Sequence, residues 1–160
     1  LTITARAADG DGRRAPVGVR QFDIQPADRM LYAFAEGWHE DEYDPATGLR
    51  WRWTSDRAVI RLKGATGGVG LTLRGESPLR YVDAAPTVRV TAGGRVVGQF
   101  QPDADFEWTV TVPAADVARG AGAIAIETDR IYLPGPAEGT SDERRLGLRV
   151  YESRVYPLSP

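Results

Sequence analysis

The feature that most constrains this sequence is a strict alternation of apolar and polar side chains. The alternation recurs in residues 1–6, 17–22, 69–74, 87–91, 106–112 and 146–151. Successive side chains of a β-strand point to opposite faces of its sheet, so a period of two predicts half-buried antiparallel strands. Counting the weaker runs as well, we expect roughly nine or ten strands and no helical repeat between them.

Glycine and proline mark the ends of these runs. The Gly93-Gly94 pair separates two strand-like runs and predicts a hairpin over residues 87–100, because a tight primed turn favours glycine. One short helix is predicted over residues 113–119, because proline marks its beginning and glycine follows its end. Three further glycine-rich stretches are predicted to be loops, namely residues 9–12, 64–68 and 135–139.

Together these patterns predict an all-β fold. Many short alternating strands without intervening helices favour a two-sheet antiparallel β-sandwich of jelly-roll type over a parallel α/β fold. A length of 160 residues is typical of one domain, and we expect residues 1–160 to form a single sandwich.

Composition excludes several classes of function. The formal net charge is -2, so the chain lacks the basic footprint of a nucleic-acid-binding protein. It contains no cysteine, which excludes disulfides, thiolate metal sites and cysteine nucleophiles. No stretch approaches the roughly 18 apolar residues of a membrane-spanning helix.

Residues 37–62 combine an acidic run with two tryptophans spaced two apart. On a strand, Trp51 and Trp53 share one face, while Arg50 and Arg52 share the other. Such a face is either a platform for sugar rings or a pair of aromatic side chains buried by the sandwich, and the sequence leaves both open. Trp38 lies beside the acidic loop.

The acidic run, residues 39–44, supports three interpretations. Alternating carboxylates at Glu40, Glu42 and Asp44 would suit a small glycoside hydrolase, although polar residues stand between them. Asp41, Glu42 and Asp44 could instead supply oxygen ligands to a structural calcium ion. The third interpretation is a solvated loop paired with nearby arginines, one of which aligns on Glu42 or Glu36 and pins the loop to a strand.

Short motifs in the chain resemble one protein family. They are Gly37-Trp38, the Arg52-Trp53-Thr54 step with the strand at 58–62, the hairpin at 94–98 and the closing segment 142–150. These resemble the C-terminal soluble domain of bacterial polytopic membrane glycosyltransferases, whose fold is similar to the jelly roll of carbohydrate-binding modules. The resemblance covers roughly residues 30–157. Residues 1–28 lie outside it and are interpreted as an added strand pair.

The resemblance implies an accessory function. It implies a non-catalytic, periplasmic or extracytoplasmic domain that binds a glycan or lipid-linked sugar beside the membrane domain of the same parent chain. It implies no nucleic-acid partner, no catalytic residue and no cofactor beyond the calcium ion considered above. It also implies a structural pair between Asp142 and Arg145 before the last strand. The residues expected to contact sugar are Trp38, Trp51, Trp53, Glu42 and Arg52. The alternative function is a structural protein–protein interaction module without sugar binding.

Overall fold

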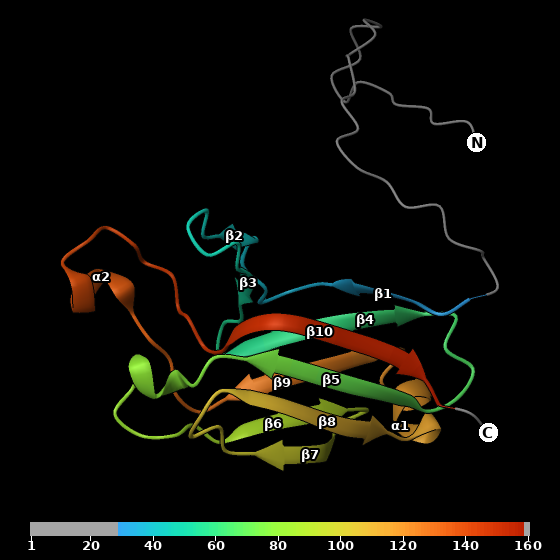
Figure 1. The fold of residues 1–160 in the computed structure, drawn as a ribbon. Coiled ribbons are helices and arrows are strands. Elements are labelled where there is room, and N and C mark those ends of the chain that lie inside the picture. The colour runs from blue at the N-terminus through green and yellow to red at the C-terminus, as the bar shows by residue number, and fades with distance from the viewer. Residues whose placement is uncertain (1–28, 159–160) are drawn as a thin grey trace, which may run out of the picture.

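The computed structural model describes residues 29–158 and contains two five-stranded antiparallel sheets (Figure 1). The first sheet has the strand order β1 (Leu31–Phe34), β4 (Arg57–Lys63), β9 (Ala123–Thr128), β6 (Val88–Ala92) and β7 (Arg95–Phe100). The second has the order β2 (Glu42–Tyr43), β3 (Arg50–Trp53), β10 (Arg149–Pro157), β5 (Val69–Gly75) and β8 (Phe106–Val112).

The strand order is that of a jelly roll with two added edge strands. Strands β3 to β10 pass from one sheet to the other at every connection except the β6–β7 hairpin, and they give the orders β3-β10-β5-β8 and β4-β9-β6-β7. This is the eight-stranded arrangement of two interlocked Greek keys. The predicted all-β, two-sheet sandwich is therefore confirmed.

Aliphatic side chains from both sheets fill the space between them. Ile60 of β4 and Ile124 of β9 meet Leu71 and Leu73 of β5, and all four are fully buried. Removing one such side chain from water contributes about 1.5–3 kcal/mol. The alternation in the sequence thus follows from the fold, because one face of each sheet packs against the other sheet and the opposite face meets solvent.

Several local predictions are confirmed. The predicted strands at 69–74, 87–91 and 106–112 correspond to β5, β6 and β8, and the predicted helix corresponds to α1 (Ala114–Arg119). The hairpin between β6 and β7 turns through Gly93 and Gly94, whose φ angles of 56° and 77° match a primed turn. The predicted strands at 1–6 and 17–22 and the loop at 9–12 lie outside the described residues.

Two predictions need correction. Residues 135–139, predicted to be a loop, lie mostly in the short helix α2 (Pro134–Glu138), which begins with proline and ends at Gly139 with a φ of 67°. Proline in the first turn and glycine after the last are compatible with a helix, so the same residues suit both structures. The last strand starts at Arg149, later than predicted, and continues to Pro157. A 3-10 turn, η1 (Pro78–Arg80), completes the regular elements.

No helix among residues 29–158 has the length and apolar character needed to span a bilayer.

The β6–β7 turn makes a testable prediction. Replacing Gly94 by alanine should cost about 1–2 kcal/mol, because the left-handed backbone disfavours a Cβ atom even though no neighbour lies within 4 Å of it. Gly67→Ala is the control: its Cβ also meets nothing within 4 Å, but its φ is not positive. Urea unfolding should show the control unchanged or up to about 1 kcal/mol more stable. Equal effects of the two substitutions would contradict the assigned turn.

Candidate ligand-binding site

The register of β3 places both tryptophans on the outer face of the second sheet. Trp53 lies opposite Arg149 of β10, and Arg52 lies opposite Val150. Val150 belongs to the core between the sheets, so Arg52 faces inward and Trp53 faces outward with Trp51. The prediction that the two tryptophans share a face is confirmed, but that face is turned away from the sandwich interior.

A cleft of about 370 Å³ opens on this outer face. We call it the outer cleft; its lining residues are Glu42, Trp51, Trp53, Arg80, Tyr81, Tyr132, Pro134, Glu138, Asp142, Arg144, Leu146 and Arg149. Its floor comes from β3 and β10, and its walls come from the segment after η1 and from the segment that contains α2. Figure 1 shows α2, β2 and β3 at one end of the sandwich, opposite the end that carries α1.

A row of three aromatic rings crosses the outer cleft. Trp53 packs edge-on against Tyr81 with ring centroids 5.0 Å apart, and Tyr81 meets Tyr132 at 5.2 Å. Trp53 is only 5% exposed, whereas the two tyrosines are half-buried. The tyrosines therefore cover the tryptophan and present the row to solvent.

An ion pair between Arg149 and Glu76 anchors the floor of the outer cleft. The Arg149 guanidinium stacks on the Trp51 ring at 3.8 Å from its centroid, and its Nη1 donates to Glu76 and to the Tyr81 hydroxyl oxygen. The side chains of the pair are only 14% and 11% exposed. The Nε of Arg149 is buried without a hydrogen-bond partner, so the stacked Trp51 ring is among its few compensating contacts.

The pair shifts the pKa values of both partners. Burial raises the pKa of Glu76, but the hydrogen bond and charge of Arg149, helped by Arg80, outweigh it and leave that pKa below its usual value. Burial lowers the pKa of Arg149, yet the hydrogen bond to Glu76 leaves it raised. Burial is also the main reason for the raised pKa of Tyr81. All three groups therefore keep their usual protonation at neutral pH.

Arg144 ties the α2 segment to β2. Its Nη1 donates to Glu42 Oε1 at 2.6 Å, and its Nε and Nη2 donate to Asp142 at 2.9 and 2.7 Å. The second oxygen of Glu42 accepts a hydrogen bond of 3.1 Å from Trp51 Nε1. Hydrogen bonds from Arg144 lower the pKa of Asp142 to about 2. The outer cleft is thus closed on one side by a fixed set of charge-assisted hydrogen bonds.

This arrangement confirms one expectation about the loops and corrects another. An arginine does align on Glu42, but it is Arg144, which is distant in the sequence, and not one of the nearby arginines; Arg61 Nη2 of β4 binds Glu36 at 2.8 Å. The expected pair between Asp142 and Arg145 is wrong, because Asp142 binds Arg144 while Arg145 extends to Asp56 at 3.1 Å. Neighbouring arginines on an extended segment point to opposite sides, so a shift of one residue exchanges their partners.

Two of the predicted sugar contacts lie elsewhere. The Trp38 ring packs at a tilt against Phe34, with ring centroids 4.6 Å apart, and its Nε1 donates to the Val59 carbonyl at 3.0 Å. Arg52 also lies over the Phe34 ring and binds Asp41 at 2.9 Å. Trp38 and Arg52 line a separate cleft of about 280 Å³ at the β1 edge, to which Trp51 also contributes. The structure therefore gathers Glu42, Trp51 and Trp53 in the outer cleft and separates the other two.

The three carboxylates considered for calcium do not come together. Asp41 binds Arg52, Glu42 binds Arg144, and Asp44 accepts hydrogen bonds from the Ala46 amide at 2.8 Å and the Thr47 hydroxyl at 2.7 Å. Within residues 29–158, no group of three or more His, Cys, Asp or Glu side chains is arranged to hold a metal ion.

Sequence reasoning missed Glu76, Tyr81, Tyr132 and Arg149. Arg149 occupies a polar position of a predicted strand, so its outward direction could have been inferred. The other three lie in connecting segments without alternation, and only the tertiary fold brings them to β3 and β10.

Comparisons with known proteins found no matching family model, no matching curated protein and no matching solved structure.

The Glu76–Arg149 pair makes a prediction that depends on pH. Glu76→Gln should destabilise the protein by about 3 kcal/mol at neutral pH, because it leaves a largely buried guanidinium without its carboxylate. The folded-state pKa of Glu76 is lowered, so its contribution is present at neutral pH and is lost as the pH falls through that lowered value. Urea unfolding of both proteins should therefore show the difference shrinking in acid.

Glu107→Gln provides the matched control, since Glu107 is an exposed partner of Arg154 on the same sheet. It should change stability by less than about 1 kcal/mol. A Glu76→Gln effect that matches the control, or that stays constant in acid, would show that the pair does not anchor the cleft.

Proposed function

We propose that this chain is a non-catalytic domain that binds a glycan in the outer cleft. The observation that carries the proposal is the combination of half-buried aromatic rings with fixed polar groups in one concave site. Binding sites for small ligands are typically clefts of about 300–1,000 Å³ with aromatic walls and a few well-placed polar groups. The outer cleft, at about 370 Å³, falls at the small end of that range.

The aromatic side chains suit the apolar faces of a sugar ring. The face of an aromatic ring carries partial negative charge and attracts the weakly positive hydrogens of C–H groups. Trp51, Tyr81 and Tyr132 are half-buried and line the outer cleft from three different segments. A ring or two of a glycan can therefore be held against them.

The polar side chains suit hydroxyl groups better than they suit an ion. A sugar hydroxyl both donates and accepts hydrogen bonds. Among the lining residues Glu42, Asp142 and Arg144 already form one paired set, and Arg149 is paired with Glu76 outside the lining. The lining carboxylate of Glu138 accepts a hydrogen bond from the Tyr132 hydroxyl. A neutral ligand can use their remaining lone pairs and N–H groups without leaving a charge unpaired, so the proposal specifies a neutral sugar.

The same pairing is the reason to assign no bond-breaking step to the outer cleft. A general acid in glycoside hydrolysis needs a raised pKa. The pKa values of Glu76 and Asp142 are lowered, and arginines hold both of these carboxylates and that of Glu42. The remaining lining carboxylate, Glu138, accepts a hydrogen bond from Tyr132 and has no second free carboxylate to act with. Their chemistry suits a role in binding.

The proposed setting follows from the sequence resemblance alone. In that setting the domain is the periplasmic or extracytoplasmic part of a bacterial cell-envelope glycosyltransferase or related glycan protein, where it binds a glycan or lipid-linked sugar beside the membrane domain. A genomic sequence upstream that encodes several membrane-spanning helices would support this setting.

Calorimetric titration of the 160-residue chain against arabinan, mannan, galactan and peptidoglycan fragments tests the proposal. At least one neutral glycan should bind, and Tyr132→Ala and Trp51→Ala should each weaken it about tenfold, since losing one aromatic contact removes about 1–1.5 kcal/mol. The control is Tyr156→Ala, a tyrosine on the same sheet but outside the outer cleft. Binding lost equally in all three variants, or no binding at all, would overturn the proposal.

A second candidate function is a protein–protein interaction module, and one observation favours it. Among residues 29–158, β1 is an edge strand of the first sheet, and its Tyr32 and Phe34 are each 39% accessible. Exposed aromatics on an open strand edge are typical of docking surfaces. This module would be favoured if none of the glycans binds in calorimetry and if the chain self-associates in a way that Phe34→Ser abolishes.

A further inference from the structure

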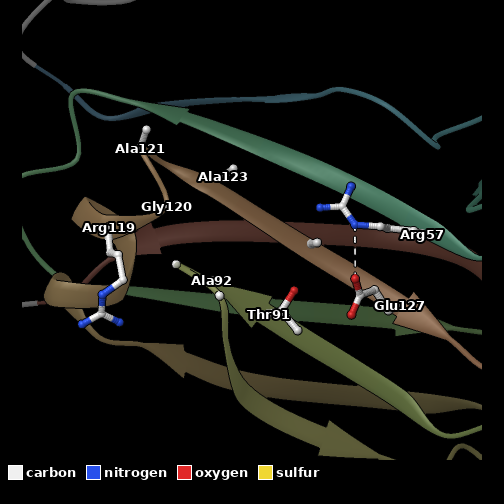
Figure 2. A pocket seen from close by; sticks show the side chains of 11 residues that line it. Arg57, Thr91, Ala92, Arg119, Gly120, Ala121, Ala123 and Glu127 are labelled. Atoms are coloured by element: carbon white, nitrogen blue, oxygen red, sulfur yellow. Dashed lines mark hydrogen bonds and ion pairs between the residues drawn. The ribbon is translucent and has the colours of Figure 1, made fainter.

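A second concave surface lies on the outer face of the first sheet, on the opposite side of the sandwich from the outer cleft. It encloses about 560 Å³. We call it the arginine groove; its lining residues are Arg57, Thr91, Ala92, Gly93, Gly94, Arg119, Gly120, Ala121, Ala123, Ala125 and Glu127. Figure 2 shows Arg119 at one end and the Arg57–Glu127 pair at the other.

Small side chains keep the middle of the groove open. In the cross-strand register Ala125 of β9 lies opposite Val59 of β4 and Thr91 of β6, and Ala123 lies opposite Arg61. From residue 123 to residue 127 the floor follows β9 for about 13 Å. No aromatic side chain lines the groove. It is therefore an extended trough that differs in character from the aromatic outer cleft.

Guanidinium groups dominate both ends of the trough. Arg119 is 52% exposed, while its partner Asp116, at 2.5 Å, is 1% exposed, so solvent meets the cation and not the carboxylate. At the other end Glu127 lies between Arg57 and Arg89 in one cross-strand row. Glu127 binds Arg57 at 3.1 Å, while Arg89 donates to Gln99, and Arg57 is 57% exposed.

The rest of this sheet face also carries more cations than carboxylates. Arg61 and Lys63 of β4 also point outward, and of these Arg61 has a carboxylate partner in Glu36. The whole chain nevertheless has a formal net charge of -2. On this face the cations Arg57, Arg61, Lys63, Arg89 and Arg119 outnumber the carboxylates Glu36, Glu127 and the buried Asp116. An excess of positive charge around a concave surface strengthens its field on an anionic ligand.

We propose that the arginine groove binds a strand of an anionic polysaccharide. Carboxylate-bearing sugars spaced along a chain would meet Arg57 at one end and Arg119 at the other, while the small floor residues admit the chain between them. This second surface is independent of the proposed glycan site in the outer cleft, and the two surfaces take ligands of different charge.

The spacing of the cations favours a polysaccharide over nucleic acid. Duplex DNA carries one charge per roughly 1.7 Å of its axis and demands a dense run of basic residues. Single strands bind through stacking on aromatic side chains. The groove has cations mainly at its ends and no aromatic lining. A concave trough also fits a chain better than a membrane surface.

The test measures binding of polygalacturonate and of dextran sulfate to the full chain, with neutral dextran as the uncharged reference. Both anionic polymers should bind, with affinity that falls as salt rises. Ala123→Glu should weaken binding about tenfold or more by placing a like charge on the floor, and Arg57→Gln should weaken it about threefold. Arg154→Gln is the control: it removes an equally exposed arginine from the opposite sheet and should change affinity less than about twofold.

Thermal unfolding of each variant confirms that it is folded. Tyr132→Ala should leave binding of the anionic polymers intact, which separates failure of this proposal from failure of the outer-cleft proposal. The assignment is overturned if neither polymer binds, if the control weakens binding as much as the groove variants do, or if duplex DNA or anionic lipid vesicles bind more tightly through the same residues.

Discussion

The antiparallel pairing of β3 with β10 is the contact on which the outer cleft depends. It joins residues 52–53 to residues 149–150, far apart in the sequence, and decides which of their side chains face outward. A slip of β3 by one residue against β10 would turn Trp53 toward the core and Arg52 outward. The fully buried Leu71 and Leu73 of neighbouring β5 show how little space the interior has for such a change. The jelly-roll core therefore fixes the geometry of a polar site that lies outside it.

Paired charges then give that site its shape. Glu76 binds the Arg149 guanidinium and holds it over the Trp51 ring, and Arg144 joins the α2 segment to β2 through Glu42 and Asp142. Largely buried ion pairs contribute less to net stability than to geometry, since desolvation offsets much of their attraction. In this protein the ion pairs fix the walls and the floor of the outer cleft in the absence of a ligand. Preorganised polar groups of this kind reduce the entropy that binding must overcome.

The sequence determines the fold more visibly than it determines the site. Alternation identified β5, β6 and β8, and the glycine pair identified the β6–β7 turn, because these depend on neighbouring residues. The same alternation gave the shared face of the tryptophans but not the side of the sheet on which they lie. That side follows from the pairing with β10. Tyr81 and Tyr132 carry no local signal, and α2 begins and ends with residues that also suit a loop. The arginine groove was missed because the formal net charge averages over the whole chain and does not show where the charges lie.

Indole N–H signals provide the most direct test of where a glycan binds. The chain has four tryptophans, and each gives one indole signal in a ¹⁵N correlation spectrum. Titration with a glycan that binds in calorimetry should shift the signal of Trp51, whose Nε1 donates to Glu42 in the outer cleft. The signal of Trp108 should stay in place, because Trp108 packs on Phe100 outside that cleft. A shift confined to Trp108, or a saturated glycan complex that leaves the Trp51 signal unmoved, would contradict the account.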